Sequence, residues 1–241
     1  MPDVDLICLA NSYKEGGRCV AGLRLDGGGW VRPVSTVAGG PLHRRHFELE
    51  DRSEPQLFDV IRIGVERHCP LPHHPENWLI DASRWSLLRR EAADDHRGLL
   101  NRWVACGADL LGDSRLAIPG GEFECDPISK SLQLIRPCDL FWKVVELEGK
   151  KKVKAVFRLG TMHYKLPFTD PDFHSVLLRR GIGNHSLSAA GIPEQSELLL
   201  TISMSEPFFG HCYKLASALL ILPKQQICLA MKSASYHFAA K

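Results

Sequence analysis

Apolar and polar residues alternate over several short runs of the chain, and a period of two residues is typical of β-strands with one buried face. Residues 18–25 show this alternation most plainly, and residues 6–10 form a shorter apolar run before them. A polar connection that ends in glycine spans residues 11–17, and an Asp-Gly-Gly-Gly turn at residues 26–29 leads back into residues 30–34. This pattern predicts a β-meander at the start of the chain.

Strand-like runs start again after a stretch rich in Gly, Asp and Pro at residues 106–127, where we expect the boundary between two halves. One helix is expected from Asp81 or Ser83 towards Trp103, and another over residues 172–180. The further expected strands are residues 57–65 in the first half and residues 132–135, 140–147, 153–159, 162–168, 198–204 and 213–222 in the second.

About five strands and one helical insertion in each half fit two small open barrels. We therefore predict a mainly β fold of two OB-like five-stranded barrels with short helical insertions. The first OB-like domain is expected over residues 1–110, a linker over 111–126 and the second OB-like domain over 127–241. A single β-sandwich is the alternative that the periodicity leaves open.

Composition and charge narrow the range of functions. A chain of 241 residues with 44% hydrophobic residues is long enough for two folded cores. Its net charge of +2 is far from the strongly basic balance of a protein that coats duplex DNA, so any nucleic-acid site must be a local patch. The eight cysteines form no Cys-x-x-Cys pair, and neither a signal peptide nor a membrane-length apolar run is found. We expect a cytoplasmic protein with reduced thiols.

Distinctive blocks of sequence lie along most of the chain, up to about residue 222. They are ICLANSYK (7–14), GRCVAG (17–22), GWVRPVS (29–35), LFDVIRI (57–63), PENWLID (75–81), YKL (164–166) before TDP (169–171), LTIS (200–203) before EPF (206–208), and CYKL (212–215). Together these blocks resemble the bacterial dual OB-containing domain family. The resemblance implies a pair of OB folds that recognise nucleic acid or nucleotides, and an association with bacterial conflict systems; fold transfers better than function.

Polar and basic residues around the first two expected strands form one candidate ligand site. The hydroxyl and amide groups can bond bases or phosphates, Tyr13 can stack on a base, and cations can neutralise phosphates. A solvated turn capped by its own side chains, and a tryptophan buried in the core, are the alternative interpretations. The candidate residues are Asn11, Ser12, Lys14, Arg18, Trp30 and Arg32.

A second candidate site follows a hairpin turn expected at residues 148–151. In the next strand, alternation puts the cations on one face, which is suitable for binding a phosphate backbone. The alternative interpretation is that lysines on a solvent-exposed face keep an edge strand soluble. Two aromatic-plus-lysine pairs occur further on, and each is expected to offer only one group because neighbouring side chains on a strand point to opposite faces. The candidate residues are Lys152, Lys154, Arg158, Tyr164, Tyr213 and Lys214.

Two clusters could be considered for metal chemistry, and neither is expected to bind an ion. The His and Cys residues of the segment 68–74 are adjacent in pairs, which suits a closed tetrahedral site poorly, and no second ligand pair has finger-like spacing. Asp170, Asp172 and His174 could form a metal-dependent hydrolase site, but an Asp-Pro turn followed by a helix cap accounts for the aspartates. No phosphate-loop, dinucleotide or catalytic motif is found, so no cofactor is expected.

These features predict a non-catalytic recognition module that binds nucleic acid or a nucleotide. Single strands or ends are favoured because shallow barrel faces with aromatic and basic residues can stack unpaired bases. A protein-interaction adaptor and a metal-dependent enzyme acting on nucleic acid are the two alternatives. We expect a nucleic-acid or nucleotide ligand, with a protein partner as the adaptor alternative, and no membrane. The choice of DNA or RNA, the oligomeric state and the role of residues 223–241 stay open.

Overall fold

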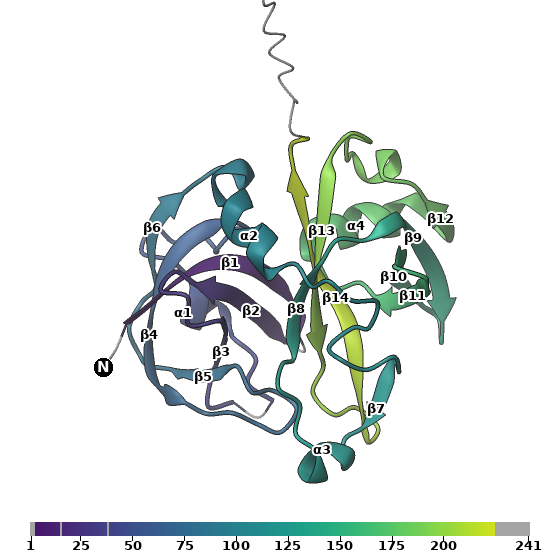
Figure 1. Ribbon diagram of the computed structural model, residues 1–241. Helices are drawn as coiled ribbons and strands as arrows, with labels where there is room; N and C mark the ends of the chain where they lie inside the picture. Colours follow the sequence, from purple (N-terminus) through teal and green to yellow (C-terminus); the bar gives the residue numbers. More distant parts are fainter. Residues whose placement is uncertain (1–2, 15, 38, 225–241) are drawn as a thin grey trace, which may run out of the picture.

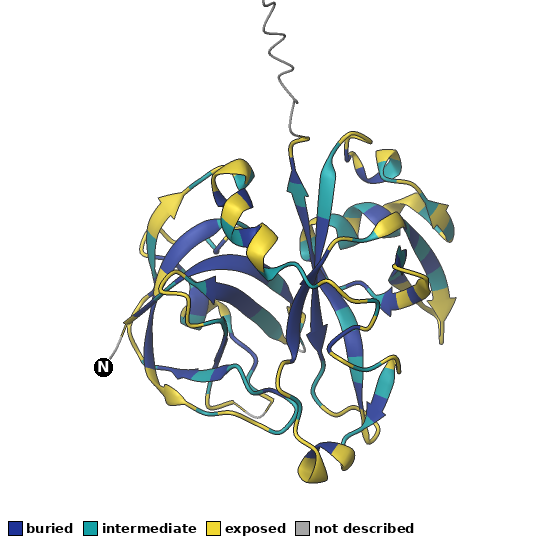
Figure 2. Cartoon of the chain, viewed as in Figure 1, coloured by how far each residue is buried: buried dark blue, intermediate teal, exposed yellow. Residues whose placement is uncertain are grey.

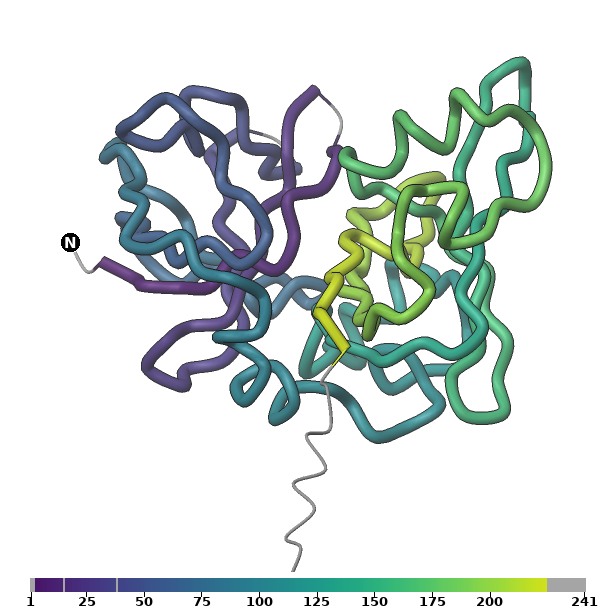
Figure 3. The backbone as a smooth tube through the Cα atoms, turned by 90° about the horizontal axis from the view of Figure 1, so that it is seen from above, coloured from purple at the N-terminus to yellow at the C-terminus, as the bar shows by residue number. Residues whose placement is uncertain are grey.

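The computed structural model describes residues 3–14, 16–37 and 39–224. Two β-rich lobes lie side by side, the first built from the N-terminal half of the chain and the second from the C-terminal half (Figure 1, Figure 3). The prediction of a mainly β fold with two OB-like barrels is confirmed.

Five strands close a barrel in the first lobe. The strands of this lobe are β1 (Asp3–Lys14), β2 (Gly17–Arg24), β3 (Trp30–Val34), β4 (Asp59–His68), β5 (Asn77–Ile80) and β6 (Ser86–Arg90). β1 pairs antiparallel with both β2 and β4, and β3 pairs antiparallel with β2 and parallel with β5. The closed path is therefore β1-β2-β3-β5-β4 and back to β1, while β6 pairs with β4. This is the Greek-key path of a five-stranded OB barrel.

The second lobe follows the same path. Its strands are β7 (Ala117–Pro119), β8 (Leu132–Ile135), β9 (Cys138–Leu147), β10 (Lys150–Leu159), β11 (Met162–Pro167), β12 (Gly183–His185), β13 (Glu197–Met204) and β14 (His211–Leu222). β8 and β9, two residues apart, together serve as the first strand: β9 pairs with β10 and β8 pairs with β13. β11 follows β10, and a parallel bridge between Phe168 and Ala216 joins its end to β14. The β9–β10 turn has positive φ at Glu148 and Gly149, as a two-residue hairpin requires.

Short helical segments connect the strands. They are α1 (Arg44–Phe47), η1 (Ala93–His96), α2 (Arg97–Trp103), α3 (Glu122–Cys125), α4 (Pro171–Arg180) and η2 (Ser188–Ala190). α1 follows the third strand of the first barrel and α4 follows the third strand of the second, so the helix occupies the same place in both. Among the described residues, no helix has the length and apolar character needed to span a membrane.

Each lobe has its own core, and a third apolar cluster joins the two. Outward-facing residues of β1 and β2 pack on outward-facing residues of β8, β13 and β14, so the strands are buried on both sides where the lobes meet (Figure 2). A hydrogen bond also crosses this interface: the Thr201 hydroxyl donates to the Leu9 backbone carbonyl at 2.6 Å. Fully burying a leucine stabilises by about 1.5–3 kcal/mol, so this cluster holds the lobes together firmly. Its aliphatic members are Ile7, Leu9, Leu23, Leu100, Leu134, Leu199, Leu220 and Leu222.

Three local predictions differ from the structure. The expected loop at residues 11–17 is strand through Lys14, and β2 begins at Gly17. The expected helix from residue 81 to Trp103 is helical only from Ala93, because Asp81 caps a turn through the Ser83 amide and β6 follows. The expected boundary at residues 106–127 contains β7 and α3, which pack on the second lobe. Residues 225–241 lie outside the described residues.

Candidate nucleic-acid interface

The outer face of β9, β10 and β11 carries a patch of lysines, which we call the lysine face. Its lysines are Lys143, Lys152, Lys154 and Lys165. Val153, Ala155 and Phe157, on the opposite face of β10, are buried in the second core. Lys143 lies directly opposite Lys154 in the β9–β10 ladder, and Lys165 lies two residues along β11 from Pro167, the partner of Lys154. The alternation therefore turns all four ammonium groups outward.

The charges of the lysine face are not neutralised within the described residues. None of its four lysines has a carboxylate within 4.0 Å there, whereas Arg158 at the end of β10 is paired with Asp139 at 2.9 Å. Partial burial, then the charges of Lys165 and Lys152, lower the pKa of Lys154. Like charges directly opposite each other destabilise a sheet. An anion bound across this face would relieve that repulsion.

A second group of residues lies where the surface of the first lobe meets α4. Tyr13 stands opposite Arg18 in the β1–β2 ladder, and the Arg18 guanidinium lies 4.8 Å from the centre of the Tyr13 ring. On the other side, the Tyr13 ring meets the His174 ring edge to face at 5.9 Å. Burial, and secondarily the charge of Lys152, lower the pKa of His174. These contacts connect the first lobe to the edge of the lysine face.

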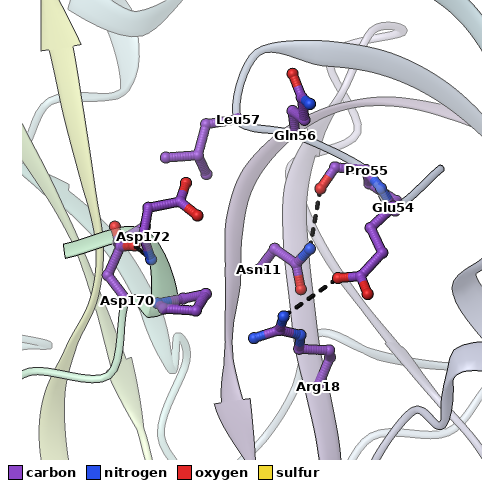
Figure 4. Close-up of a pocket in the computed structure, with 10 residues that line it drawn as sticks. Asn11, Arg18, Glu54, Pro55, Gln56, Leu57, Asp170 and Asp172 are labelled. Carbon is purple, nitrogen blue, oxygen red and sulfur yellow. Dashed lines mark hydrogen bonds and ion pairs between the residues drawn. The ribbon is translucent and has the colours of Figure 1, made fainter. Parts of the chain in front are cut away.

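A cavity of about 200 Å³ opens beside Arg18, between the lobes. Figure 4 shows Asn11, Arg18 and Glu54 on one wall and Asp170 and Asp172 on the other. The Arg18 side chain donates to Glu54 and the Asn11 amide donates to the Pro55 carbonyl, which fixes both groups. The Arg18 Nη1 and Asn11 Oδ1 atoms are buried and have no hydrogen-bond partner among the described residues. The cavity thus offers one donor and several acceptors to a polar ligand.

Several residues proposed from the sequence are buried. The Ser12 hydroxyl donates to the Cys19 carbonyl, and the Arg32 guanidinium reaches the Ser131 carbonyl across the interface at 3.4 Å. Tyr164 donates to the Ala108 carbonyl, and the Lys214 ammonium donates to the carbonyl of Asp113. These four side chains are buried, so they have no surface to offer a ligand.

The remaining candidates lie apart from the lysine face. Trp30 is partly buried against the apolar cluster between the lobes, and Tyr213 is partly buried on β14. Lys14 lies 3.1 Å from Glu206, which comes from the second lobe. Because Tyr13 and Lys14 are neighbours on a strand, their side chains leave on opposite faces. Of the first-half candidates, only Asn11 and Arg18 therefore share the cavity.

A model of the dual OB-containing domain matches residues 4–219, nearly all of the described chain. The chain belongs to this family. No curated protein matches the sequence. One solved structure, a murine DNA-binding protein bound to double-stranded DNA, aligns over 92% of this chain and 100% of its own with 12% identity and a TM-score of 0.30. A TM-score that low carries no argument about fold or ligand.

In this dual OB-containing chain the aspartates of the alternative hydrolase site have structural contacts. Asp170 is buried, accepts from the Asp172 amide as the N-cap of α4, and accepts from the Leu219 amide of β14 at 2.8 Å. Burial raises the pKa of Asp170 to about 6. The Asp170 carboxylate thus ties α4 to the barrel, and the described residues do not group it with Asp172 and His174 around a common ion position.

Sequence reasoning missed three contributors to these sites. Lys143 and Lys165 lie on strands that flank β10, and alternation along each strand could have put them on its outer face. Glu206 carries no local signal, because its contacts with His73 and His74 join residues about 130 positions apart.

Proposed function

We propose that this protein binds single-stranded nucleic acid across the lysine face, with the strand continuing past Tyr13 to the cavity beside Arg18. The observation that carries the proposal is the cluster of Lys143, Lys152, Lys154 and Lys165 without carboxylate partners among the described residues. β10 and β11 are the second and third strands of their barrel, and this face of an OB fold binds oligonucleotides in many proteins.

Single strands fit the shape and charge better than duplexes. The lysines offer a small number of phosphate contacts. Two aromatic rings lie nearby: Phe141, on the same outer face, is partly exposed, and Tyr13, where the two lobes meet, is half exposed. Stacking of bases on such rings tolerates any sequence. At the cavity, Arg18 Nη1 and Asn11 Oδ1 offer a donor and an acceptor to the edge of a base. Phosphates would therefore bind on the second lobe and a base between the lobes.

The test is fluorescence anisotropy with short single-stranded DNA and RNA at several salt concentrations. The variant Lys152→Ala with Lys154→Ala removes two exposed or partly exposed cations. It should weaken binding and lower the slope of log affinity against log salt by roughly 0.7 for each lost phosphate contact. Its unfolding free energy should change little, because surface lysines are usually replaceable within about 0.5 kcal/mol.

The matched control is Arg67→Ala with Arg84→Ala, which removes the same charge from exposed positions of the first lobe. This control should keep both the affinity and the salt slope of the wild type. Wild-type protein that binds neither DNA nor RNA, or equal losses in the two double variants, would contradict the proposed face. The wider proposal includes a cytoplasmic role in a bacterial conflict system, where such a module would meet foreign single strands or ends.

An adaptor function is the second candidate, and a specific surface favours it. Phe208 and Phe209, in the loop between β13 and β14, are 55% and 86% exposed. Exposed aromatic residues are enriched at protein interfaces. Copurification of one stoichiometric partner after nuclease treatment, lost in Phe209→Ser but retained in the lysine double variant, would support the adaptor instead of the nucleic-acid module.

A further inference from the structure

Two loops, one from each lobe, bring together three side chains that can bind a metal ion. His73 and His74 lie between β4 and β5, and Glu206 lies between β13 and β14. The His73 Nε2 atom lies 3.0 Å from Glu206 Oε2, and the His74 Nδ1 atom lies 3.2 Å from Glu206 Oε1. The ligand atoms of the three residues all lie within 4.8 Å of one another. Zinc–nitrogen bonds of about 2.0–2.1 Å put neighbouring ligand atoms of a tetrahedral site ~3.3 Å apart, which is close to the two histidine–glutamate separations.

The hydrogen bonds of His74 fix which nitrogen faces Glu206. Its Nε2 atom lies 2.9 Å from the Met204 carbonyl. A carbonyl only accepts, so Nε2 carries the hydrogen and the neutral ring has its lone pair on Nδ1. That Nδ1 atom is buried on a side chain only 2% exposed, and the part of the chain that the structure describes gives it no well-oriented hydrogen-bond partner, although the Glu206 carboxylate is close. Two acceptors therefore face each other, an arrangement that a cation between them makes favourable.

We propose that His73, His74 and Glu206 bind a divalent transition-metal ion, with zinc as the natural occupant of such a ligand set. Two imidazoles and one carboxylate are a common protein donor set for zinc, and they leave a fourth position for water or for a ligand oxygen. The Met204 carbonyl orients His74, as partners of ligating histidines usually do. Because the donors come from both lobes, the ion would clamp the two barrels together. From the sequence we expect no metal at residues 68–74, because adjacent ligands suit a closed tetrahedral site poorly and no second ligand pair has finger-like spacing. The third donor, Glu206, lies about 130 residues from the two histidines.

Two nearby cations should lower the affinity of this site for a metal ion. The Lys14 ammonium lies 3.1 Å from Glu206 Oε1, so it competes with a metal ion for the carboxylate. Arg32 is buried in the same region and has no carboxylate partner among the described residues. We therefore expect an affinity below that of a structural zinc finger, and an increase in affinity when Lys14 is replaced by a neutral residue.

The experiment measures Zn²⁺ and Co²⁺ binding to the full chain after removal of metal by a chelator. Titration calorimetry should give one Zn²⁺ per chain, and Co²⁺ should give the absorption bands of a four-coordinate site. Zn²⁺ should raise the melting temperature because it binds only the folded state. His73→Gln, His74→Gln and Glu206→Gln should each weaken Zn²⁺ binding by roughly tenfold or more.

The matched control is His96→Gln. His96 is also buried and lies 3.1 Å from the Glu91 carboxylate, but no second histidine joins that pair among the described residues. This variant should bind Zn²⁺ like the wild type, and Lys14→Met should bind it more tightly. His73 is partly exposed, so His73→Gln keeps the test valid if the His74 variant does not fold. The proposal is overturned if wild-type protein binds no Zn²⁺, if His73→Gln binds it equally well, or if Lys14→Met binds it less tightly.

Discussion

The ring of Tyr13 meets the ring of His174 edge to face, with 5.9 Å between their centres and 74° between their planes. One residue belongs to β1 and the other to α4, so this contact joins the two lobes at the surface. The backbone confirms the junction, because the Tyr13 amide donates to the Thr169 carbonyl at 3.0 Å. Half of the Tyr13 side chain is exposed. A strand that crosses from one lobe to the other would therefore pass over this ring.

Replacing Tyr13 by Ala should weaken the binding of single-stranded oligonucleotides by about 1–3 kcal/mol, the usual loss when one stacked base loses its aromatic platform. Tyr13→Phe keeps the ring and should bind like the wild type. Anisotropy at fixed salt measures both. If Ala and Phe at this position reduce the affinity equally, the hydroxyl is the important group and no base stacks there.

The apolar interface predicts that the lobes unfold together. Leu199 is buried among residues of both lobes, and Leu199→Ala should lower the free energy of unfolding by about 2–5 kcal/mol. Because each lobe covers the other, calorimetry should show one transition in the wild type. Leu147→Ala, at a position 53% exposed, is the control and should change stability by less than about 0.5 kcal/mol. Two separate transitions in the wild type would show that the interface does not make the two lobes unfold together.

Much of the second barrel could be predicted from the sequence because its signals are local. The period of two along β10 puts Lys152 and Lys154 on the opposite face from Val153, and a two-residue turn precedes that strand. The two-residue period does not say whether another part of the protein covers the polar face of a strand. The other lobe covers Arg32, and the Lys214 ammonium bonds a carbonyl near β7, so both cations are inside.

The site between the lobes could not be predicted from local patterns. Asn11 and Arg18 lie on adjacent strands and are brought together by a hairpin, but the opposite wall of their cavity comes from Asp170 and Asp172. The contact of His73 with Glu206 also depends on how the lobes dock. The apolar outer faces of β1 and β14 decide how the two lobes dock. The sequence pattern of these strands indicates only that they are buried on both faces.

Asp170 should make stability depend on pH in a defined direction. Its pKa is raised by burial to about 6, from 3.8 in an exposed carboxyl. Between these values the folded chain keeps a proton that the unfolded chain has lost, so rising pH lowers stability across about pH 4–6, by up to about 3 kcal/mol. Asp170→Asn cannot ionise. Its free energy of unfolding should therefore improve relative to wild type as the pH rises through this window.

The control for this measurement is Leu147→Ala, a change at an exposed position that removes no titratable group. The difference in unfolding free energy between wild type and Leu147→Ala should stay nearly constant from pH 4 to pH 7, because the variant keeps every group that binds protons. Urea unfolding at each pH provides the free energies. A constant difference for Asp170→Asn as well would show that Asp170 titrates in the folded protein as it does when exposed.

Arg18 should affect affinity without affecting salt dependence. One of its terminal nitrogens is held by Glu54, and the other, Nη1, is buried without a partner beside the cavity. Arg18→Lys keeps the positive charge but cannot hold Glu54 and present a second fixed donor, because the planar fork of arginine is lost. If Nη1 reads a base edge, the variant should lose about 1–3 kcal/mol of binding energy. Its salt slope should equal that of the wild type, because no charge is removed.

Lys154→Ala should behave differently, because it removes a charge. Its slope of log affinity against log salt should be lower than that of the wild type, and its unfolding free energy should be similar. Anisotropy titrations of both variants at several salt concentrations separate these roles. A lower slope in Arg18→Lys would instead place a phosphate, and not a base, beside Arg18.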